Sequence, residues 1–555
     1  MIFKCEALRA SKPSFSPQSL PLELAGGACS MHYDTVLLRG QRGLSPSAHL
    51  KCLCYIFRSC TLPEEAFSQC CHTLTMNGYL NESNFMMVEE GFSTRDLLEN
   101  ILVELCQASD QQAFFVADLG DIVKKHLRFL KALPRVRPYF PVKCNGSEGV
   151  IRLLAELGAG FACTNKAEIS RVQNIGVPAD KIFYSSPCKQ VAHIKYAASR
   201  GVRLMAFDNE VELSKVARSH PHARMLLGIT ADSSPSAHPS MMFGTTLESC
   251  RHLLEAAKEQ AVEVVGVSFH LGNGGLEPQA FAQSLAAAQL AFEMGTELGY
   301  QMHLLDIGGG FPGTEDTRAR FEEVAAGINA ALDLYFPDGC GVEIVARPGR
   351  YYVTSAFTFA ASVTAMAEVP VDQPGPGSVW DGGTGSCLSL PEPSPCSPAE
   401  EDSGSKKNLV YHLSDGIYGA FSRLLFDSPC PRPQLHKRPA PGHPWHSSSL
   451  RGPPGHAEDG IAEGLELPEL QVGDWLIFED MGAYSITTSS PLGERPQPQI
   501  TYAMSRLAWK TIQLFQGKPP QSDDDRESVC APLSCGWEMA ESLCVAPVFA
   551  PTGII

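Results

Sequence analysis

The stretch His303-Leu-Leu-Asp-Ile-Gly-Gly-Gly-Phe-Pro-Gly313 joins a short apolar run to a glycine triplet. A run of this length between turn signals is typical of a buried strand. Gly308-Gly-Gly310 can bring backbone N–H groups against a phosphate. A glycine triplet alone could be no more than a turn, but the Phe-Pro-Gly-Thr-Glu315 that follows favours a ligand loop. The stretch therefore predicts a strand that ends at a candidate phosphate site.

Short apolar runs alternate with amphipathic stretches on either side of this segment. Buried parallel strands read as continuous apolar runs because helices cover the sheet. A series of such units is what a closed (β/α)8 barrel requires. The runs are Phe114–Ala117, Tyr139–Val142, Lys181–Ser185, Arg203–Phe207, Ala223–Ile229, Val264–Phe269, His303–Ile307 and Val342–Ala346, and the helical stretches include Ile122–Lys131, Lys166–Ile175, Val211–Arg218 and Pro278–Leu298. We predict an α/β fold with the barrel over residues 118–356.

The rest of the chain has a different pattern. Strands without intervening helices, such as Val410–Leu413, Asp474–Glu479 and Gln499–Ala503, predict a second, β-rich domain over residues 76–117 and 357–522. Pro, Gly, Ser and acidic residues at 374–407 are typical of a flexible insertion, and a second Pro/His-rich loop is expected at 429–444. We expect residues 1–75 to be an extension and residues 523–555 a tail.

Composition narrows the functional class. The formal net charge of −17 argues against nucleic acid as a partner, because phosphate binding needs a basic surface. No apolar run is long enough to span a membrane, and Met1–Gln18 lacks the apolar core of a secretory signal. The 19 cysteines show no disulfide or zinc-ligand spacing, so we expect reduced thiols, no metal site and a cytoplasmic location. Additional perinuclear, vesicle or nuclear pools stay open.

A second motif, Arg137-Pro-Tyr-Phe-Pro-Val-Lys143-Cys-Asn145, places a lysine after the first barrel strand. Barrel active sites lie at the carboxyl ends of strands, so Lys143 could form an imine with pyridoxal phosphate. An ordinary exposed lysine at a strand end is the alternative.

Together these motifs resemble those of the eukaryotic ornithine, diaminopimelate and arginine decarboxylase family, over about residues 76–555 apart from the insertions. The resemblance implies an alanine racemase-like barrel in which Lys143 is the imine lysine and His270 stacks on the pyridoxal ring. It also implies that the phosphate is held by Gly308, Gly309, Gly310, Arg350 and Tyr484. Asp427 would lie where the family binds the distal amine of the substrate across a dimer interface.

Several positions depart from the family pattern. The Ala-Glu-Pro-Gly-Arg motif reads Ala346-Arg347-Pro-Gly-Arg350, and a guanidinium cannot keep a pyridine nitrogen protonated as a carboxylate does. Alanine racemases of this barrel type use an arginine there, so cofactor binding stays open. The family's Trp-Gly-Pro-x-Cys-Asp-Gly reads Arg451-Gly-Pro-Pro-Gly455-His456-Ala457, which leaves no thiol for proton transfer. The other departures are Ala162, in place of an aspartate, and Asn273, in place of a phosphate-contacting serine.

The departures imply a member without an intact catalytic set and without a functional cofactor. Residues 189–224 hold seven Lys/Arg against three Asp/Glu, which suits an acidic partner but is also compatible with an ordinary solvated helix face. This segment is similar to the antizyme-binding region of ornithine decarboxylase, and the candidate contacts are Lys195, Arg200, Arg203, Lys215 and Arg218.

The resemblance thus implies an antizyme inhibitor, a monomer or weak homodimer that captures antizyme and so raises polyamine synthesis and uptake. Two alternatives remain. One is a decarboxylase with residual activity on ornithine, arginine or lysine, favoured by Lys143, His270 and Arg350. The other is a nonfunctional product, suggested by the composition of residues 1–75 and 374–407.

Overall fold

The computed structural model describes residues 84–515, apart from 90, 92, 109, 231–242, 272–277, 370–406, 427–431, 454–458 and 487–496. The expected extension at 1–75, the insertion at 374–407 and the tail at 523–555 lie outside the described residues, except for Lys407 itself. All described residues belong to one compact unit, residues 68–555.

Eight parallel strands close into a barrel in the order β10-β3-β4-β5-β6-β7-β8-β9. Their bounds are β3 Val136–Pro141, β4 Gly160–Cys163, β5 Ile182–Tyr184, β6 Leu204–Phe207, β7 Arg224–Gly228, β8 Glu263–Ser268, β9 Leu304–Asp306 and β10 Glu343–Ala346. The predicted barrel is confirmed. Its second strand, β4, is absent from the runs that the sequence pattern predicts, because Gly-Phe-Ala-Cys contains no β-branched residue.

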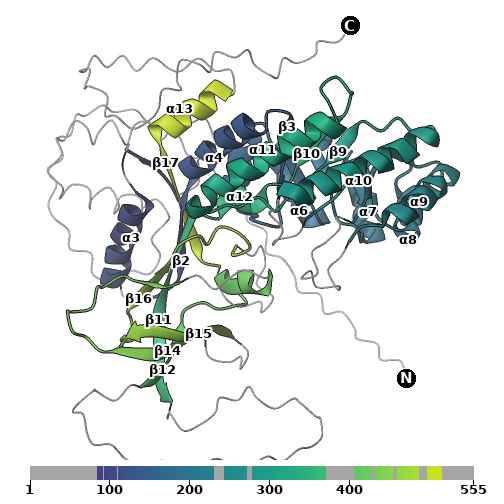
Figure 1. The fold of residues 1–555 in the computed structure, drawn as a ribbon. Coiled ribbons are helices and arrows are strands. Elements are labelled where there is room, and N and C mark those ends of the chain that lie inside the picture. Colours follow the sequence, from purple (N-terminus) through teal and green to yellow (C-terminus); the bar gives the residue numbers. More distant parts are fainter. Residues whose placement is uncertain are drawn as a thin grey trace, which may run out of the picture. The chain divides into compact units, whose positions relative to one another are not determined.

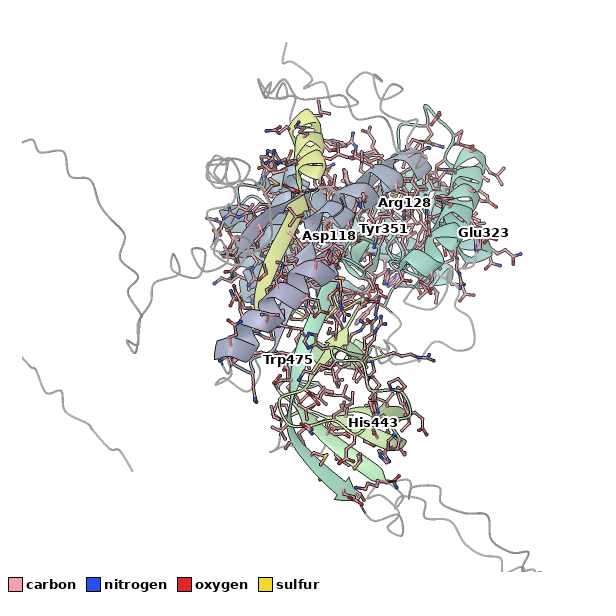
Figure 2. The ribbon with its side chains drawn as sticks, turned by 90° about the vertical axis from the view of Figure 1, so that its left-hand side faces the viewer. Asp118, Arg128, Glu323, Tyr351, His443 and Trp475 are labelled. Atoms are coloured by element: carbon pink, nitrogen blue, oxygen red, sulfur yellow. The ribbon has the colours of Figure 1, made fainter. Side chains whose placement is uncertain are left out.

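Helices follow the strands and cover the barrel (Figure 1). Their bounds are α4 Leu119–Ala132, α5 Glu148–Glu156, α6 Lys166–Asn174, α7 Val191–Ser199, α8 Glu210–Ser219, α9 Leu247–Glu259, α10 Pro278–Glu297, α11 Arg318–Tyr335 and α12 Gly349–Val353, with the 3-10 turns η2 Ala179–Lys181 and η4 Glu315–Thr317. Asp118 (labelled in Figure 2) is the N-cap of helix α4, and its carboxylate accepts the N–H groups of Gly120 and Asp121.

Two apolar layers hold the barrel together. Inside it, one side chain or more from each strand meets in a cluster made of Ala162, Phe183, Leu204, Ala206, Leu226, Val265, Leu304 and Val345, with Tyr139 packed against it. The opposite strand faces pack against the helices. Gly266 is required between β8 and β9, because a Cβ there would overlap the carbonyl oxygen of Leu304.

A nine-stranded sheet forms the β-rich part of the chain, as the sequence predicts. Its main order is β1-β17-β2-β11-β12-β14-β15, with β16 paired to β11 and β13. The strands are β1 Phe85–Val88, β2 Phe114–Asp118, β11 Phe357–Val369, β12 Asn408–Leu413, β13 Gln434–Leu435, β14 Trp445–Arg451, β15 Gly460–Pro468, β16 Trp475–Phe478 and β17 Gln499–Ser505, and the helical elements beside them are α3 Thr94–Ala108, η5 Ala420–Phe426 and α13 Arg506–Phe515.

The sheet corrects one expectation. Residues 429–444 are not a loop throughout, because β13 lies within them and pairs with β16. Strand β2 lies between two distant partners, β11 on one side and β17 on the other. Among the described helices, none is both long and apolar enough to cross a bilayer.

Candidate functional site

The carboxyl ends of β3, β8, β9 and β10 bring most of the predicted site residues together. The N–H of Gly309, after β9, donates to His270 Nδ1, after β8, at 3.0 Å. The N–H of Arg347, after β10, donates to the Gly308 carbonyl at 2.6 Å. The loop after β3 joins them through Tyr484, whose N–H donates to the Cys144 carbonyl at 2.8 Å. The barrel mouth is therefore built from loops of both structural parts of the chain.

The glycine loop has the backbone that only glycine adopts readily. Gly308 and Gly310 have φ angles of +71° and +98°. A Cβ on Gly308 would overlap the Phe269 carbonyl oxygen, and one on Gly309 would lie 2.6 Å from the Arg347 carbonyl oxygen. The N–H of Gly308 donates to Asp306 Oδ1 at 2.9 Å, so part of the loop's donor capacity is used within the protein.

Arg347 lies in an ion pair that sequence reasoning missed. Its Nε is 2.9 Å from Asp306 Oδ2, and the two side chains are 18% and 0% exposed. The guanidinium also donates to the Phe269 carbonyl at 3.3 Å, and its Cζ lies 5.9 Å from the centre of the Phe183 ring. Ser268 Oγ donates to Asp306 Oδ2 at 2.7 Å. The only sequence signal for Asp306 is its place at the end of β9, directly before the glycine loop.

His270 is a neutral imidazole in this environment. The residue as a whole is exposed, and its Nδ1 is turned to the glycine loop. Desolvation, and then the positive charge of Arg347, lower the pKa of His270 to about 3. Because Nδ1 accepts the N–H of Gly309, the ring proton resides on Nε2 at neutral pH.

Lys143 lies in the turn after β3 and is exposed. Its positive charge is close enough to lower the pKa of Glu168, although burial is the larger effect and raises that pKa. The Glu168 carboxylate accepts the N–H of Thr164 at 2.6 Å, at the start of α6. An Asn165-x-x-Glu168 pattern of helix capping could have pointed to this residue.

The buried Cys144 does not replace the missing thiol. Burial raises its pKa to about 12, so it stays protonated and unreactive at neutral pH. Ala162, where the family pattern has an acid, is 1% exposed and packs inside the barrel.

Arg350 and Tyr484 form a second group of contacts in the site, apart from the Arg347–Asp306 ion pair. The Arg350 guanidinium carbon lies 4.8 Å from the centre of the Tyr484 ring. Tyr484 has a φ angle of +59°, which is uncommon for an aromatic residue and marks a strained position. Its carbonyl accepts the hydroxyl of Ser422 at 2.9 Å, and burial raises the pKa of its phenol. These contacts fix the Tyr484 ring beside Arg350.

The remaining predicted site residues are placed as follows. Asn273, Asp427, Gly455 and His456 lie outside the described residues. Arg451 is the last residue of β14 and pairs across to Gly460 of β15.

The basic segment divides into exposed residues and residues held in ion pairs within the protein. Lys195, Arg200, Arg203 and Arg218 are exposed on or beside α7 and α8, which pack against each other; we call these four residues the basic surface. Lys215 differs, because its ammonium pairs with Glu212 and donates to the Lys189 carbonyl at 2.8 Å. Lys189 is itself buried against Glu212, and Arg224 pairs with Glu263 at 3.9 Å. The positive patch is therefore smaller than the charge count implies.

The site fits one end of a pyridoxal phosphate group and not the other. Arg350, Tyr484 and the positive φ angles of the glycine loop suit a phosphate. At the end where the family resemblance implies the pyridine ring, the buried Asp306 carboxylate is already paired with Arg347, and a cation there would oppose a protonated pyridine nitrogen. The donor set of this end does not fit a protonated pyridine ring.

Comparisons with known proteins agree with the fold. The family model described as "Pyridoxal-dependent decarboxylase, pyridoxal binding domain" matches residues 119–354. A solved arginine decarboxylase from Paramecium bursaria Chlorella virus, bound to agmatine, is similar with a TM-score of 0.62 and 27% identity over 73% of this chain and 99% of that one. The lysine/ornithine decarboxylase of Vibrio vulnificus, solved with cadaverine, has a TM-score of 0.58 and 28% identity over 74% and 96%. The fold is that of the alanine racemase-like decarboxylases.

Relatives with known names narrow the class of protein within the alanine racemase-like decarboxylases. Antizyme inhibitor 2 of Homo sapiens is 56% identical over 484 residues, which cover 86% of this chain and all of that protein. Ornithine decarboxylase of Mus musculus is 45% identical over 461 residues, 82% of this chain and 95% of that enzyme. The chain belongs to the family of ornithine decarboxylases and antizyme inhibitors, and the resemblance to that family predicted from the motifs is confirmed.

Proposed function

We propose that this chain is an antizyme inhibitor without decarboxylase activity. It binds ornithine decarboxylase antizyme, releases ornithine decarboxylase from inhibition and degradation, and so raises polyamine synthesis and uptake. The observation that carries the proposal is the Arg347–Asp306 ion pair, because it puts a cation where decarboxylation needs a carboxylate. The 56% identity to a protein named antizyme inhibitor 2 supports the choice of partner.

The basic surface supports antizyme binding at α7 and α8. Its four cations are exposed, and exposed cations steer an acidic partner and set its orientation. Lys215 is left out of this surface, because its ammonium is held against Glu212 and is only partly exposed. The proposed contacts are therefore Lys195, Arg200, Arg203 and Arg218.

A titration of the full chain with antizyme in the presence of ornithine decarboxylase tests the proposal. We expect stoichiometric capture of antizyme and recovery of decarboxylase activity. Absence of binding at micromolar concentrations would exclude an antizyme inhibitor.

A second candidate function is residual decarboxylation of ornithine or arginine, which makes putrescine or agmatine. The place of Lys143 directly after β3 and the contact between His270 and the glycine loop favour it. Release of labelled carbon dioxide that disappears in Lys143→Ala would establish this function. No release together with antizyme capture is the expected result.

Oligomeric state and location belong to the same proposal. A chain without a shared catalytic site has no need of a dimer, so we propose a monomer or a weak homodimer in the cytoplasm. Sedimentation at low micromolar concentration tests the first part, and a tight dimer would contradict it. Imaging of the tagged chain tests the second.

A further inference from the structure

The Arg347 side chain is held on several sides at the mouth of the barrel. Its Nε lies 2.9 Å from Asp306 Oδ2 and 3.2 Å from Oδ1. Its Nη2 is 3.3 Å from the Phe269 carbonyl oxygen and 3.4 Å from Ser268 Oγ. Arg347 thus follows β10, contacts the end of β8 and pairs with the last residue of β9, so that one guanidinium links three neighbouring strands.

Asp306 needs such a partner. It is fully buried, and an unpaired buried carboxylate is one of the costliest groups in a protein interior. Its oxygens accept three kinds of donor: the Ser268 hydroxyl at 2.7 Å, the Gly308 N–H at 2.9 Å and the Arg347 guanidinium. Of these only the guanidinium carries a full positive charge. The charge of the barrel mouth is therefore balanced by the chain's own residues.

We propose that Arg347 is an internal counter-ion that completes the barrel mouth, so that this barrel folds and stays closed at the ends of β8, β9 and β10 without pyridoxal phosphate. This inference goes beyond the proposed function, because it concerns how the barrel is stabilised whether or not antizyme is bound. The same geometry predicts that a ligand with a cationic ring gains no ion pair at this end, because Asp306 is already paired with Arg347.

A double-mutant cycle on the full chain tests the pair. Arg347→Met leaves the Asp306 carboxylate buried without its cation, and we expect a melting temperature lower by roughly 5 °C or more. Asp306→Asn combined with Arg347→Met removes both charges, and this double variant should be more stable than Arg347→Met alone. Arg251→Met breaks an exposed pair with Glu297, where both side chains are about half exposed, and serves as the matched control with a shift below about 1 °C.

Two outcomes of the cycle would overturn the proposal. One is an Arg347→Met variant as stable as the parent, and the other is a double variant that loses at least as much as the two single variants together. If Arg347→Met does not fold, Arg347→Gln in the presence and absence of Asp306→Asn gives the same comparison with a polar side chain of similar length.

A second arm uses pyridoxal 5'-phosphate itself as the probe, with the melting temperature as the readout. The parent chain should show no stabilisation by saturating pyridoxal 5'-phosphate. Arg347→Glu sets two carboxylates side by side, so it should be less stable than the parent and should recover stability when the probe is added. Stabilisation of the parent by several degrees, or no difference between the parent and Arg347→Glu, would show that Arg347 does not take the place we assign to it.

Discussion

The ammonium of Lys189 lies 2.6 Å from the carboxylate of Glu212, and the two side chains are 0% and 2% exposed. Lys189 also donates to the carbonyls of Ala206 at 2.5 Å and Ser186 at 3.0 Å, while Glu212 accepts the Lys189 N–H at 3.0 Å. The pair joins the loop before α7 to the first turn of α8. It therefore fixes the two helices that carry the basic surface.

Glu212→Gln should destabilise the chain by roughly 3–5 kcal/mol, because it leaves the Lys189 ammonium buried without its anion. Burial lowers the pKa of Lys189 and Glu212 opposes that shift, so the variant also favours the neutral amine. Urea unfolding at pH 7 measures the effect. Glu210→Gln, an exposed neighbour on the same helix, is the control and should change the free energy of unfolding by less than about 0.5 kcal/mol. Equal effects of both substitutions would contradict the assignment.

Charge reversal on the basic surface should weaken antizyme binding. Lys195→Glu with Arg218→Glu changes one exposed residue on each of α7 and α8, and we expect a loss of about tenfold or more in affinity together with a weaker dependence on salt. The matched control, Lys124→Glu with Lys131→Glu, makes the same change of net charge on exposed residues of α4. If both pairs reduce the affinity alike, the effect is one of overall charge and the basic surface is not the contact. Lys215 is unsuitable for this test, because its reversal would also break the contact with Glu212.

Gly308→Ala should destabilise the barrel at least twice as much as Gly299→Ala. Both glycines have positive φ angles, +71° and +84°, so both substitutions strain the backbone by about 1–2 kcal/mol. Only at Gly308 does the added Cβ meet protein atoms, the Phe269 carbonyl and His270 Cα, whereas the space around Gly299 is open. Thermal unfolding of the two variants gives the comparison, and equal losses would mean that the glycine loop tolerates a side chain.

Stability should fall between about pH 6.5 and pH 4 because of His126. This residue is 2% exposed on α4, its Nδ1 is 2.9 Å from the Tyr352 hydroxyl oxygen, and burial lowers its pKa to about 4. In that pH range the unfolded chain binds a proton that the folded chain does not, so folding loses on the order of 3 kcal/mol as the pH falls through the window. Urea midpoints at pH 7, 5.5 and 4.5 should decline less steeply for His126→Gln. Parallel pH profiles of the two proteins would rule His126 out.

The barrel could be predicted from the sequence because its signals are local. A buried strand such as Leu304–Asp306 can be recognised from a short apolar run, and the amphipathic helix after it from the spacing of its apolar residues. The nine-stranded sheet was predicted only in outline, because strands such as β11 and β2 pair across the whole length of the barrel. The periodicity of a short stretch of sequence does not indicate which distant strand will be its partner in the sheet.

In the site too, some features follow from the local sequence and others only from the pairing of distant segments. Arg347 could be singled out from the sequence as a departure, but its partner Asp306 follows from the alignment of β9 with β10, where Val345 pairs with Asp306. The sequence also could not show that Lys195 is exposed whereas Lys215 forms an ion pair with Glu212. Both are lysines of one basic segment, and only the packing of the helices distinguishes their surroundings.

The position of β2 has a consequence for the order in which the chain can mature. Its antiparallel neighbour β11 is made only after the whole barrel, and its parallel neighbour β17 is the last described strand. During synthesis, β2 therefore leaves the ribosome long before either strand that covers its edges, and an uncovered edge of Phe-Phe-Val-Ala invites pairing with another chain. Nascent or truncated forms that stop before residue 499 would carry that open edge, so we expect them to associate with other chains more readily than the finished protein does.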